Sequence, residues 1–509
     1  MPLTLNKCLI ANRGEIAVRI MRACYELGIG AVAVYSEADV RAMHTRFADE
    51  AYPIGAANPA ESYLNGAQLI EVALVAGCDC VHPGYGFLSE SEDFAQAVLD
   101  TGLVWIGPPP EAIRQMGVKT EARMLMEKAG VPLVPGYQGG GDDAAFADAA
   151  ERIGYPVIVK AAGGGGGKGM RIVHQSSGLL DALAAARREA QHAFGDDRVF
   201  LEHYVEHAHH VEIQVLADHH GNTVHLFERE CSAQRRHQKV IEESPSPLLS
   251  DELRAHMGMA GVAAAQAVGY VNAGTVEFIV TPENQFYFLE MNTRLQVEHP
   301  VTELVTGLDL VKLQFAIAAG EALPFTQSDL SQRGHAIECR LYAEDARAGF
   351  LPATGDVLVF HPPEGLGVRV DAGVESGDSI TIHYDPMIAK IIVYERTRAA
   401  AIQRMDAALR DTVILGTTTN LEFLRALLNH PAFATGDVDT GFIERHIAEL
   451  LPPSSLPEAA LIAVALTELF GAHDVRNMSS RDAESAGLTD PWSRLDGFRL
   501  CQEKNLQTR

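Results

Sequence analysis

The stretch PVIVKAAGGGGGKG, residues 156–169, decides what kind of fold this chain has. Its first half is an apolar strand that ends in Lys160, and its second half is a glycine-rich loop. Glycines let backbone N–H groups approach an anion closely, so a strand followed by such a loop indicates a phosphate-binding loop and not a linker. The loop is not of the Walker A type, because Ala162 and Gly169 stand where that motif needs Gly and Ser or Thr.

A predicted β-hairpin about a hundred residues later carries oxygen donors on one face. We expect strands over 275–280 and 286–290, joined by a turn. Glu290 and Asn292 are two residues apart and point to one side, and Glu277 on the partner strand can face them. Two carboxylates and an amide suit Mg²⁺ bridging nucleotide phosphates. The residues that follow alternate polar side chains where an apolar stripe is expected: Arg294, Gln296 and Glu298.

The rest of the chain predicts a multidomain fold of the α/β and α+β classes. Strand and helix signals alternate over residues 1–117, which predicts an open α/β domain. Residues 118–330 surround the glycine-rich loop, and residues 331–447 change from strands to helices. Residues 448–509 read as a linker and a partial, partly helical tail.

Composition excludes several classes of function. The 509 residues include 41 Lys plus Arg and 67 Asp plus Glu, a formal net charge of -26, which argues against nucleic acid or an anionic membrane as a partner. Seven scattered cysteines without a CxxC pair predict reduced thiols in a cytoplasmic protein. We expect neither a signal peptide nor a membrane span. A pocket can still be basic within an acidic chain.

Longer motifs carry a resemblance to a known family. The strand with Lys160, the glycine-rich loop, Glu277 and Glu290-x-Asn292 resemble the ATP-grasp ligases. Within that superfamily the chain resembles biotin carboxylase from about residue 5 to 447, on motifs in register: RGEIA (13–17), HPGYGFLSE (82–90), RRHQK (235–239) and EMNTRLQVEHP (290–300). The implied fold has an N-terminal α/β domain, an ATP-grasp domain with a mobile glycine-rich lid over about 133–206, and a C-terminal α+β domain.

The resemblance also implies a site. The residues expected to bind ATP are Lys119, Lys160, Gly166, Gly167, Glu202, His203, Tyr204, Val205, His210, His237, Glu277 and Glu290. The metal, Mg²⁺ or Mn²⁺ but no zinc, would be held by Glu277, Glu290 and Asn292. Bicarbonate would bind Lys239, Arg294 and the Val297 N–H, and biotin would meet Tyr85, Arg294 and Arg340. The implied catalytic residues are Arg294, Glu298, Lys239 and Arg340, with Asp385 supporting Arg340.

The implied activity is the carboxylation of biotin N1 by MgATP and bicarbonate through carboxyphosphate, the first half-reaction of an acyl-CoA carboxylase. Its implied partners are a biotin carrier domain or protein, a carboxyltransferase subunit and a second copy of the chain. The tail resembles the segment that follows biotin carboxylase in acyl-CoA carboxylase α subunits, yet no Met-Lys-Met biotinylation motif occurs. Biotin is therefore expected on a separate carrier, or the chain is a truncated subunit.

Three alternatives remain at this point. A carbamoyl phosphate synthase half also makes carboxyphosphate, but it has no need of a pocket formed by Arg340 and Tyr85. A non-catalytic or truncated scaffold subunit of a carboxylase complex is compatible with the short tail. The His203–His207 stretch matches an HxxEH zinc pattern, but it lies in the expected adenine hinge and not on a helix.

Overall fold

The computed structural model describes residues 2–138, 140, 142–162, 170–236, 238–451 and 458–470. The chain divides into two units, Met1–Pro452 and Pro453–Arg509. In the second unit, α16 (Glu458–Phe470) is helical, and Leu461, Ile462, Val464 and Leu466 on it are exposed. No helix among the described residues is long and apolar enough to cross a bilayer.

The N-terminal segment forms a parallel five-stranded sheet in the order β3-β2-β1-β4-β5. Its strands are β1 (Lys7–Ile10), β2 (Gly30–Tyr35), β3 (Glu50–Pro53), β4 (Cys80–His82) and β5 (Val104–Trp105), and its helices are α1 (Gly14–Leu27), α2 (Met43–Phe47), α3 (Gly66–Val75), α4 (Glu92–Asp100) and α5 (Pro110–Gly117). Leu9 packs into one core, and Cys8 and Ile10 pack into another on the opposite face. A strand buried on both faces explains the unbroken apolar run.

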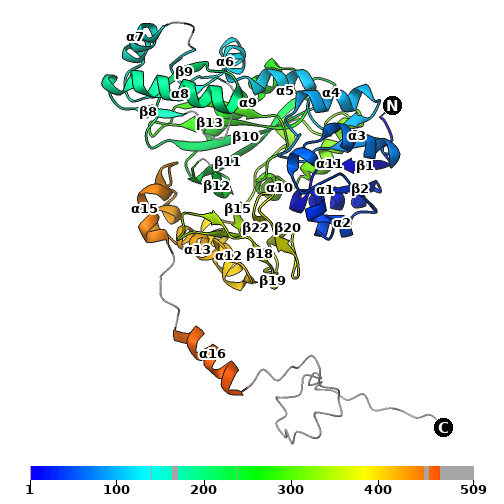
Figure 1. Ribbon diagram of the computed structural model, residues 1–509. Coiled ribbons are helices and arrows are strands. Elements are labelled where there is room, and N and C mark those ends of the chain that lie inside the picture. The colour runs from blue at the N-terminus through cyan, green and yellow to red at the C-terminus, as the bar shows by residue number, and fades with distance from the viewer. Residues whose placement is uncertain are drawn as a thin grey trace, which may run out of the picture. The chain divides into compact units, whose positions relative to one another are not determined.

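A four-stranded sheet, β6-β9-β7-β8, carries the strand that ends at the glycine-rich loop. Its elements are β6 (Gly136–Tyr137), α7 (Asp143–Ile153), β7 (Val157–Ala161), β8 (Arg171–Val173), α8 (Leu179–Phe194) and β9 (Val199–His203). Helices α7 and α8 share its apolar core (Figure 1). The loop residues 163–169 themselves lie outside the described residues.

An eight-stranded sheet joins the middle of the chain to its C-terminal part, in the order β14-β13-β10-β11-β12-β15-β22-β20. The central strands are β10 (His209–Ala217), β11 (Thr223–Arg235), β12 (Gln238–Ser244), β13 (Asn272–Val280) and β14 (Phe286–Asn292), and the later ones are β15 (His335–Tyr342), β20 (Val368–Ala372) and β22 (Met387–Glu395). Strand β12 pairs with β15, so the two halves share one hydrogen-bonded sheet.

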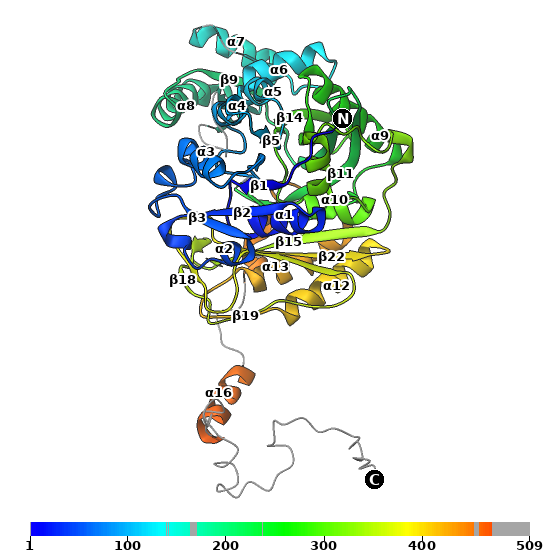
Figure 2. The same cartoon turned by 90° about the vertical axis from the view of Figure 1, so that its right-hand side faces the viewer.

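Helices cover this sheet on both sides of the β12–β15 seam. They are α6 (Lys119–Lys128), α9 (Asp251–Ala267), α10 (His299–Thr306), α11 (Leu310–Ala318), α12 (Arg398–Asp411), α13 (Leu421–Leu428), α14 (Pro431–Thr435) and α15 (Phe442–Leu450). Helices α12 and α13 pack with β15 and β22 in the C-terminal core, and α1 lies beside the C-terminal strands (Figure 2).

Short elements complete the description. The small strands are β16 (Glu344–Asp345), β17 (Leu351–Pro352), β18 (Gly355–Asp356), β19 (Val359–His361), β21 (Ser379–Ile380) and β23 (Val413–Leu415), and the 3-10 turns are η1 (Glu37–Asp39), η2 (Pro59–Glu61), η3 (Ser176–Gly178) and η4 (Gln327–Asp329). The expected fold class, a multidomain chain of the α/β and α+β classes that begins with an open α/β sheet, is confirmed. The six cysteines among the described residues are buried and unpaired.

Candidate active site

A row of charged side chains crosses the eight-stranded sheet. The strand register places Glu290 opposite Glu277, Glu277 opposite Glu212, and Glu212 opposite Arg229. Cross-strand partners point to the same face, so four neighbouring strands contribute to one polar surface. Arg229 is fully buried, and its Nη1 donates to Gln214 at 2.7 Å.

The metal expected on the hairpin is compatible with the donors found there. Asn292 Nδ2 donates to Glu277 Oε1 at 2.8 Å, which brings the amide beside the carboxylate. Glu290 is more accessible, and Lys119 Nζ lies 3.5 Å from its Oε2. Two opposed carboxylates and an amide are a set of oxygen donors that suits Mg²⁺. Glu277 and Glu290 fit such an ion.

Lys239 is the central cation of the site. Its Nζ lies 2.5 Å from Glu212 Oε2, 2.8 Å from Glu277 Oε1 and 2.6 Å from Glu298 Oε1. Burial alone would raise the pKa of Glu277, but Lys239 and then His210 hold it well below its usual range. One ammonium therefore keeps three buried carboxylates together.

Glu298 lies between two cations at the start of α10. Arg340 Nη2 donates to Glu298 Oε2 at 2.9 Å, and Lys239 occupies the other oxygen. Burial would raise the pKa of Glu298, yet the charges of Lys239 and Arg340 hold it well below the ordinary value. A fully buried carboxylate is thus kept ionised by two cations that could turn to an incoming anion.

Arg294 lies beside this group but has other partners. Its Nε donates to Glu90 Oε2 at 3.1 Å, and its Nη2 donates to Asn292 Oδ1 at 3.1 Å. Arg294 and Glu298 do not form an ion pair among the described residues, and Lys239 and Arg340 occupy the Glu298 carboxylate. Gln296 connects the two parts by donating to Glu277 at 3.1 Å.

The expected biotin-side residue Tyr85 reaches the same centre through a second buried pair. Its hydroxyl donates to Glu15, whose Oε1 is 3.3 Å from Lys390 Nζ. Lys390 in turn donates to the Val297 carbonyl at 2.6 Å, and so holds the Val297 peptide. The Tyr85 and Val297 sides are therefore linked by Glu15 and Lys390, neither of which was assigned a role from sequence.

Among the described residues, Asp385 makes no hydrogen bond or ion pair with Arg340; burial raises the pKa of Asp385, and the charge of Arg340 is one of the influences that partly offset this. Asp385 Oδ1 accepts from the Met387 backbone N–H at 2.9 Å, which uses the carboxylate to close its own turn. Glu242 supports Arg340 instead, accepting from its Nε at 2.6 Å. Glu242 lies on β12, and only the pairing of β12 with β15 brings it to Arg340.

The cations expected at the phosphates come from both sheets, with Lys160 on β7 of the small sheet and His210 on β10 of the large one. Lys160 and Arg123 both donate to the Glu202 carboxylate, so the Glu202 side chain holds these two cations together. His210 Nε2 is 2.9 Å from Glu277 Oε2. Burial would lower the pKa of His210, but the charge of Glu277 raises it.

The expected adenine hinge has one free amide. The His203 N–H donates to Pro135 O and the Tyr204 N–H donates to Pro156 O, both at 2.8 Å. Within the part of the chain that the structure describes, no group accepts from the Val205 N–H. A free backbone donor suits recognition of a planar base. His237, Gly166 and Gly167 lie outside the described residues.

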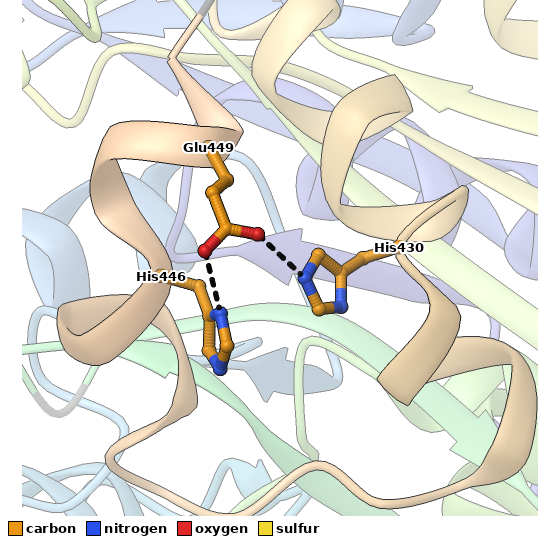
Figure 3. Close-up of side chains that lie close together, drawn as sticks. All are labelled: His430, His446 and Glu449. Carbon is orange, nitrogen blue, oxygen red and sulfur yellow. Dashed lines mark hydrogen bonds and ion pairs between the residues drawn. The ribbon is translucent and has the colours of Figure 1, made fainter.

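A second group of metal-type donors lies on the far C-terminal helices (Figure 3). His430 Nε2 is 3.3 Å from Glu449 Oε2, and His446 Nδ1 is 3.2 Å from Glu449 Oε1. The Ala432 N–H donates to His430 Nδ1 at 3.2 Å, so the proton of that ring is on Nε2 and points at Glu449. A metal ion bound to Nε2 would move the ring proton to Nδ1. Nδ1 could then no longer accept the hydrogen bond from Ala432 that caps α14. The cluster is a hydrogen-bonded tie between α14 and α15.

Family models match nearly all of the first unit. The model "Biotin carboxylase, N-terminal domain" matches residues 4–113, "Carbamoyl-phosphate synthase L chain, ATP binding domain" matches 118–326, and "Biotin carboxylase C-terminal domain" matches 338–445. Biotin carboxylase 2 of Bacillus subtilis is 53% identical over 442 residues, which are 87% of this chain and 99% of that protein. The chain belongs to the biotin carboxylase family. Members of this family are ATP-dependent ligases that catalyse carboxylation.

Longer relatives and a solved structure place the chain within this biotin carboxylase family. The mitochondrial methylcrotonoyl-CoA carboxylase subunit alpha of Dictyostelium discoideum is 49% identical over 507 residues, 99% of this chain and 72% of that protein. This chain spans 61–64% of the length of the plant and rodent subunits of the same name. The biotin carboxylase domain dimer of Hydrogenobacter thermophilus 2-oxoglutarate carboxylase, solved with MgADP, ADP and bicarbonate, has a TM-score of 0.85 and 44% identity, covering 88% of this chain and 99% of that one. The three-domain biotin carboxylase architecture is therefore shared.

Proposed function

We propose that this chain carboxylates N1 of biotin on a carrier domain, using MgATP and bicarbonate and passing through carboxyphosphate. The observation that carries the proposal is the buried, ionised Glu298 held between Lys239 and Arg340. A base between two cations is the arrangement needed to bind an anion and remove its proton. These are the residues that the family resemblance implied, and their geometry supports the proposed roles independently of it.

Bicarbonate is proposed to bind where Lys239, Arg294 and the Val297 N–H converge. As the anion arrives, Lys239 shares its charge with it, so the pKa of Glu298 rises from its depressed value toward that of a useful base. Glu298 then takes the bicarbonate proton, and the resulting oxygen nucleophile attacks the γ-phosphate of ATP to give carboxyphosphate and ADP. The held peptide at Val297 positions the anion before the transfer.

ATP is proposed to lie between the small sheet and the hairpin. Lys119, Lys160, His210 and His237 would bind its phosphates or ribose, Gly166 and Gly167 would cover the phosphates, and the hinge from Glu202 to Val205 would bind the adenine. Glu277, Glu290 and Asn292 would hold Mg²⁺ or Mn²⁺, which neutralises phosphate charge. This assigns the ATP-grasp segment to 118–330, with a lid at about 133–206, between the domains 1–117 and 331–447.

Biotin is proposed to enter on the Tyr85 side. Carboxyphosphate would break down to CO₂ and phosphate, and the phosphate would take the N1 proton. The charge left on the ureido oxygen would be stabilised by Arg340 and Arg294 while N1 attacks the CO₂ to give carboxybiotin. Preorganised cations in a water-excluded site stabilise such charge strongly, because they need not reorganise during the reaction. The proposed partners are a biotin carrier, a carboxyltransferase subunit and a second copy of the chain, in the cytoplasm.

The test is bicarbonate-dependent ATP hydrolysis by the folded, ATP-binding chain, measured with and without free biotin. We expect biotin to stimulate hydrolysis and carboxybiotin to form. ATP binding without any biotin stimulation would support a scaffold role instead. Bicarbonate-dependent hydrolysis that ammonia, and not biotin, stimulates would support carbamoyl phosphate synthesis.

Replacing Lys160 by methionine is expected to raise the KM for ATP about 10- to 100-fold, because one charged hydrogen bond to a phosphate contributes about 1.5–3 kcal/mol. Steady-state kinetics with varied ATP checks this. The matched control is Lys128→Met, which removes an exposed lysine on α6 and should leave the KM unchanged. Equal KM values for the two variants would contradict the phosphate role of Lys160.

A further inference from the structure

Two buried carboxylates lie directly opposite each other behind Arg340. Strand β12 pairs with β15 so that Glu242 faces Glu338, and both side chains have no exposed surface. Partners in an antiparallel ladder have Cβ atoms about 4.5–5.5 Å apart and point to one face. Glu242 and Glu338 therefore face each other in the interior of the protein, shielded from solvent.

The two groups do not have enough hydrogen-bond donors to be ionised together. Arg340 donates to Glu242 Oε1. Across the described ranges, no donor reaches Glu242 Oε2 or either oxygen of Glu338. Burying an unpaired carboxylate is costly, and two like charges at this spacing add repulsion. A carboxylic acid facing a carboxylate satisfies both, because the acid donates its proton to the free oxygen.

The charges of Lys390 and Arg340 partly offset the burial of Glu338, but among the described residues neither side chain donates a hydrogen bond to it. On β15 and β22, Arg340 faces Glu242 and Glu298, while Lys390 is directed at Glu15 and the Val297 carbonyl. The remaining ionisable groups near Glu338 are themselves acidic, Glu298 at α10 and Tyr85 in the N-terminal domain. Burial raises the pKa of Glu338 well above its usual value and that of Glu242 to about 7.

We propose that Glu338 is a positioning residue that stays protonated and donates a hydrogen bond to Glu242, so that the pair carries a single negative charge. That charge holds Arg340 in place against Glu298. The inference rests on the proposed function and names a residue that touches no reacting atom. Glu338 acts only through Glu242 and Arg340.

A second charge on the pair would change Arg340. If Glu338 loses its proton, two carboxylates compete with Glu298 and with the biotin enolate for one guanidinium. Carboxylation should therefore fall as the pH rises through the pKa of Glu338. Glu338→Gln cannot ionise and its amide can still donate to Glu242, so it should keep the rate within about threefold of wild type and lose this alkaline decline.

Glu338→Leu removes the donor and leaves Glu242 Oε2 unpaired. We expect a fall in kcat of about tenfold, with little change in the KM for ATP. The matched control is Glu230→Gln, which neutralises another buried carboxyl of the same sheet, bonded to Ser232 and Ser246 and not to Arg340. This control should retain the alkaline decline. Loss of the decline in Glu230→Gln, or its persistence in Glu338→Gln, would overturn the proposal.

A measurement without turnover separates this inference from the proposed function. A carboxyl whose folded pKa is raised stabilises the fold below its unfolded pKa, about 4.3, and this contribution is lost as the pH rises through the folded pKa. The free energy of unfolding of Glu338→Gln relative to wild type should therefore increase with pH.

Infrared spectra of the wild-type chain, recorded at a pH below its alkaline decline in activity, should show a protonated carboxyl band that Glu338→Gln lacks. A wild-type spectrum without any such band would overturn the proposal even if the variant failed to fold. If the chain showed this band and this stability shift but did not carboxylate biotin, the proposed function would be refuted and the inference about Glu338 would stand.

Discussion

Replacing Glu298 by glutamine is expected to lower bicarbonate-dependent ATP hydrolysis and biotin carboxylation about 10²- to 10⁴-fold. Glutamine has the same shape, but it cannot accept the bicarbonate proton. The carboxylate it replaces is fully buried and bonded to Lys239 and Arg340, so no water can easily take over as base. Initial rates of ADP release and of carboxybiotin formation, at saturating ATP and bicarbonate, measure the loss.

The control for this variant is Glu243→Gln, a neighbouring buried carboxylate that pairs with His335 and Arg398 outside the site. It should affect stability but leave the rate per folded molecule close to wild type. Glu298→Gln should also keep its affinity for ATP, measured by calorimetry, because Glu298 is not among the proposed ATP ligands. A rate within tenfold of wild type in a folded, ATP-binding Glu298→Gln would contradict the role of Glu298 as base.

Much of the site could be predicted from sequence because local spacing determines it. Side chains two residues apart on a β-strand point to the same face, which places Glu290 and Asn292 together. The hairpin then returns Glu277 to that face on the neighbouring strand. The structure pairs Glu277 with Glu290 and bonds Asn292 to Glu277. Long motifs then allowed the family to be named before any fold was known.

The supports of the site could not be predicted, because they depend on strand pairing between distant segments. Glu242 reaches Arg340 only because β12 pairs with β15, almost a hundred residues later in the chain. Tyr384-Asp385 looked like the better support from sequence, yet the turn at Met387 uses Asp385. Lys390, on an apolar strand, gave no sign that it would bond the Val297 carbonyl.

Whole-chain charge was informative about partners and not about the pocket. The net charge of -26 includes many buried carboxylates, among them Glu212, Glu277 and Glu298, which surround Lys239. Lys239, Arg229 and Arg340 offset these carboxylates, so an acidic chain can still bind an anion at this place.

Replacing Arg340 by glutamine is expected to lower biotin carboxylation about 10²- to 10³-fold, which is the effect of removing one preorganised cation from a developing oxyanion. Bicarbonate-dependent ATP hydrolysis without biotin should fall less, because Lys239 still holds Glu298. The ratio of carboxybiotin formed to ATP hydrolysed is the quantity to measure. A general loss of structure would lower both rates together and leave this ratio unchanged.

The variant also removes the cation from two buried carboxylates, Glu242 and Glu298, and breaking a buried pair costs about 3–5 kcal/mol of folding free energy. Arg398→Gln is the matched control, since it breaks a comparable buried pair with Glu243 and removes no cation from the site. Urea unfolding should show both variants destabilised, while only Arg340→Gln should uncouple ATP hydrolysis from carboxylation. If Arg398→Gln uncouples the two reactions equally, Arg340 acts through the stability of the sheet and not on the biotin enolate.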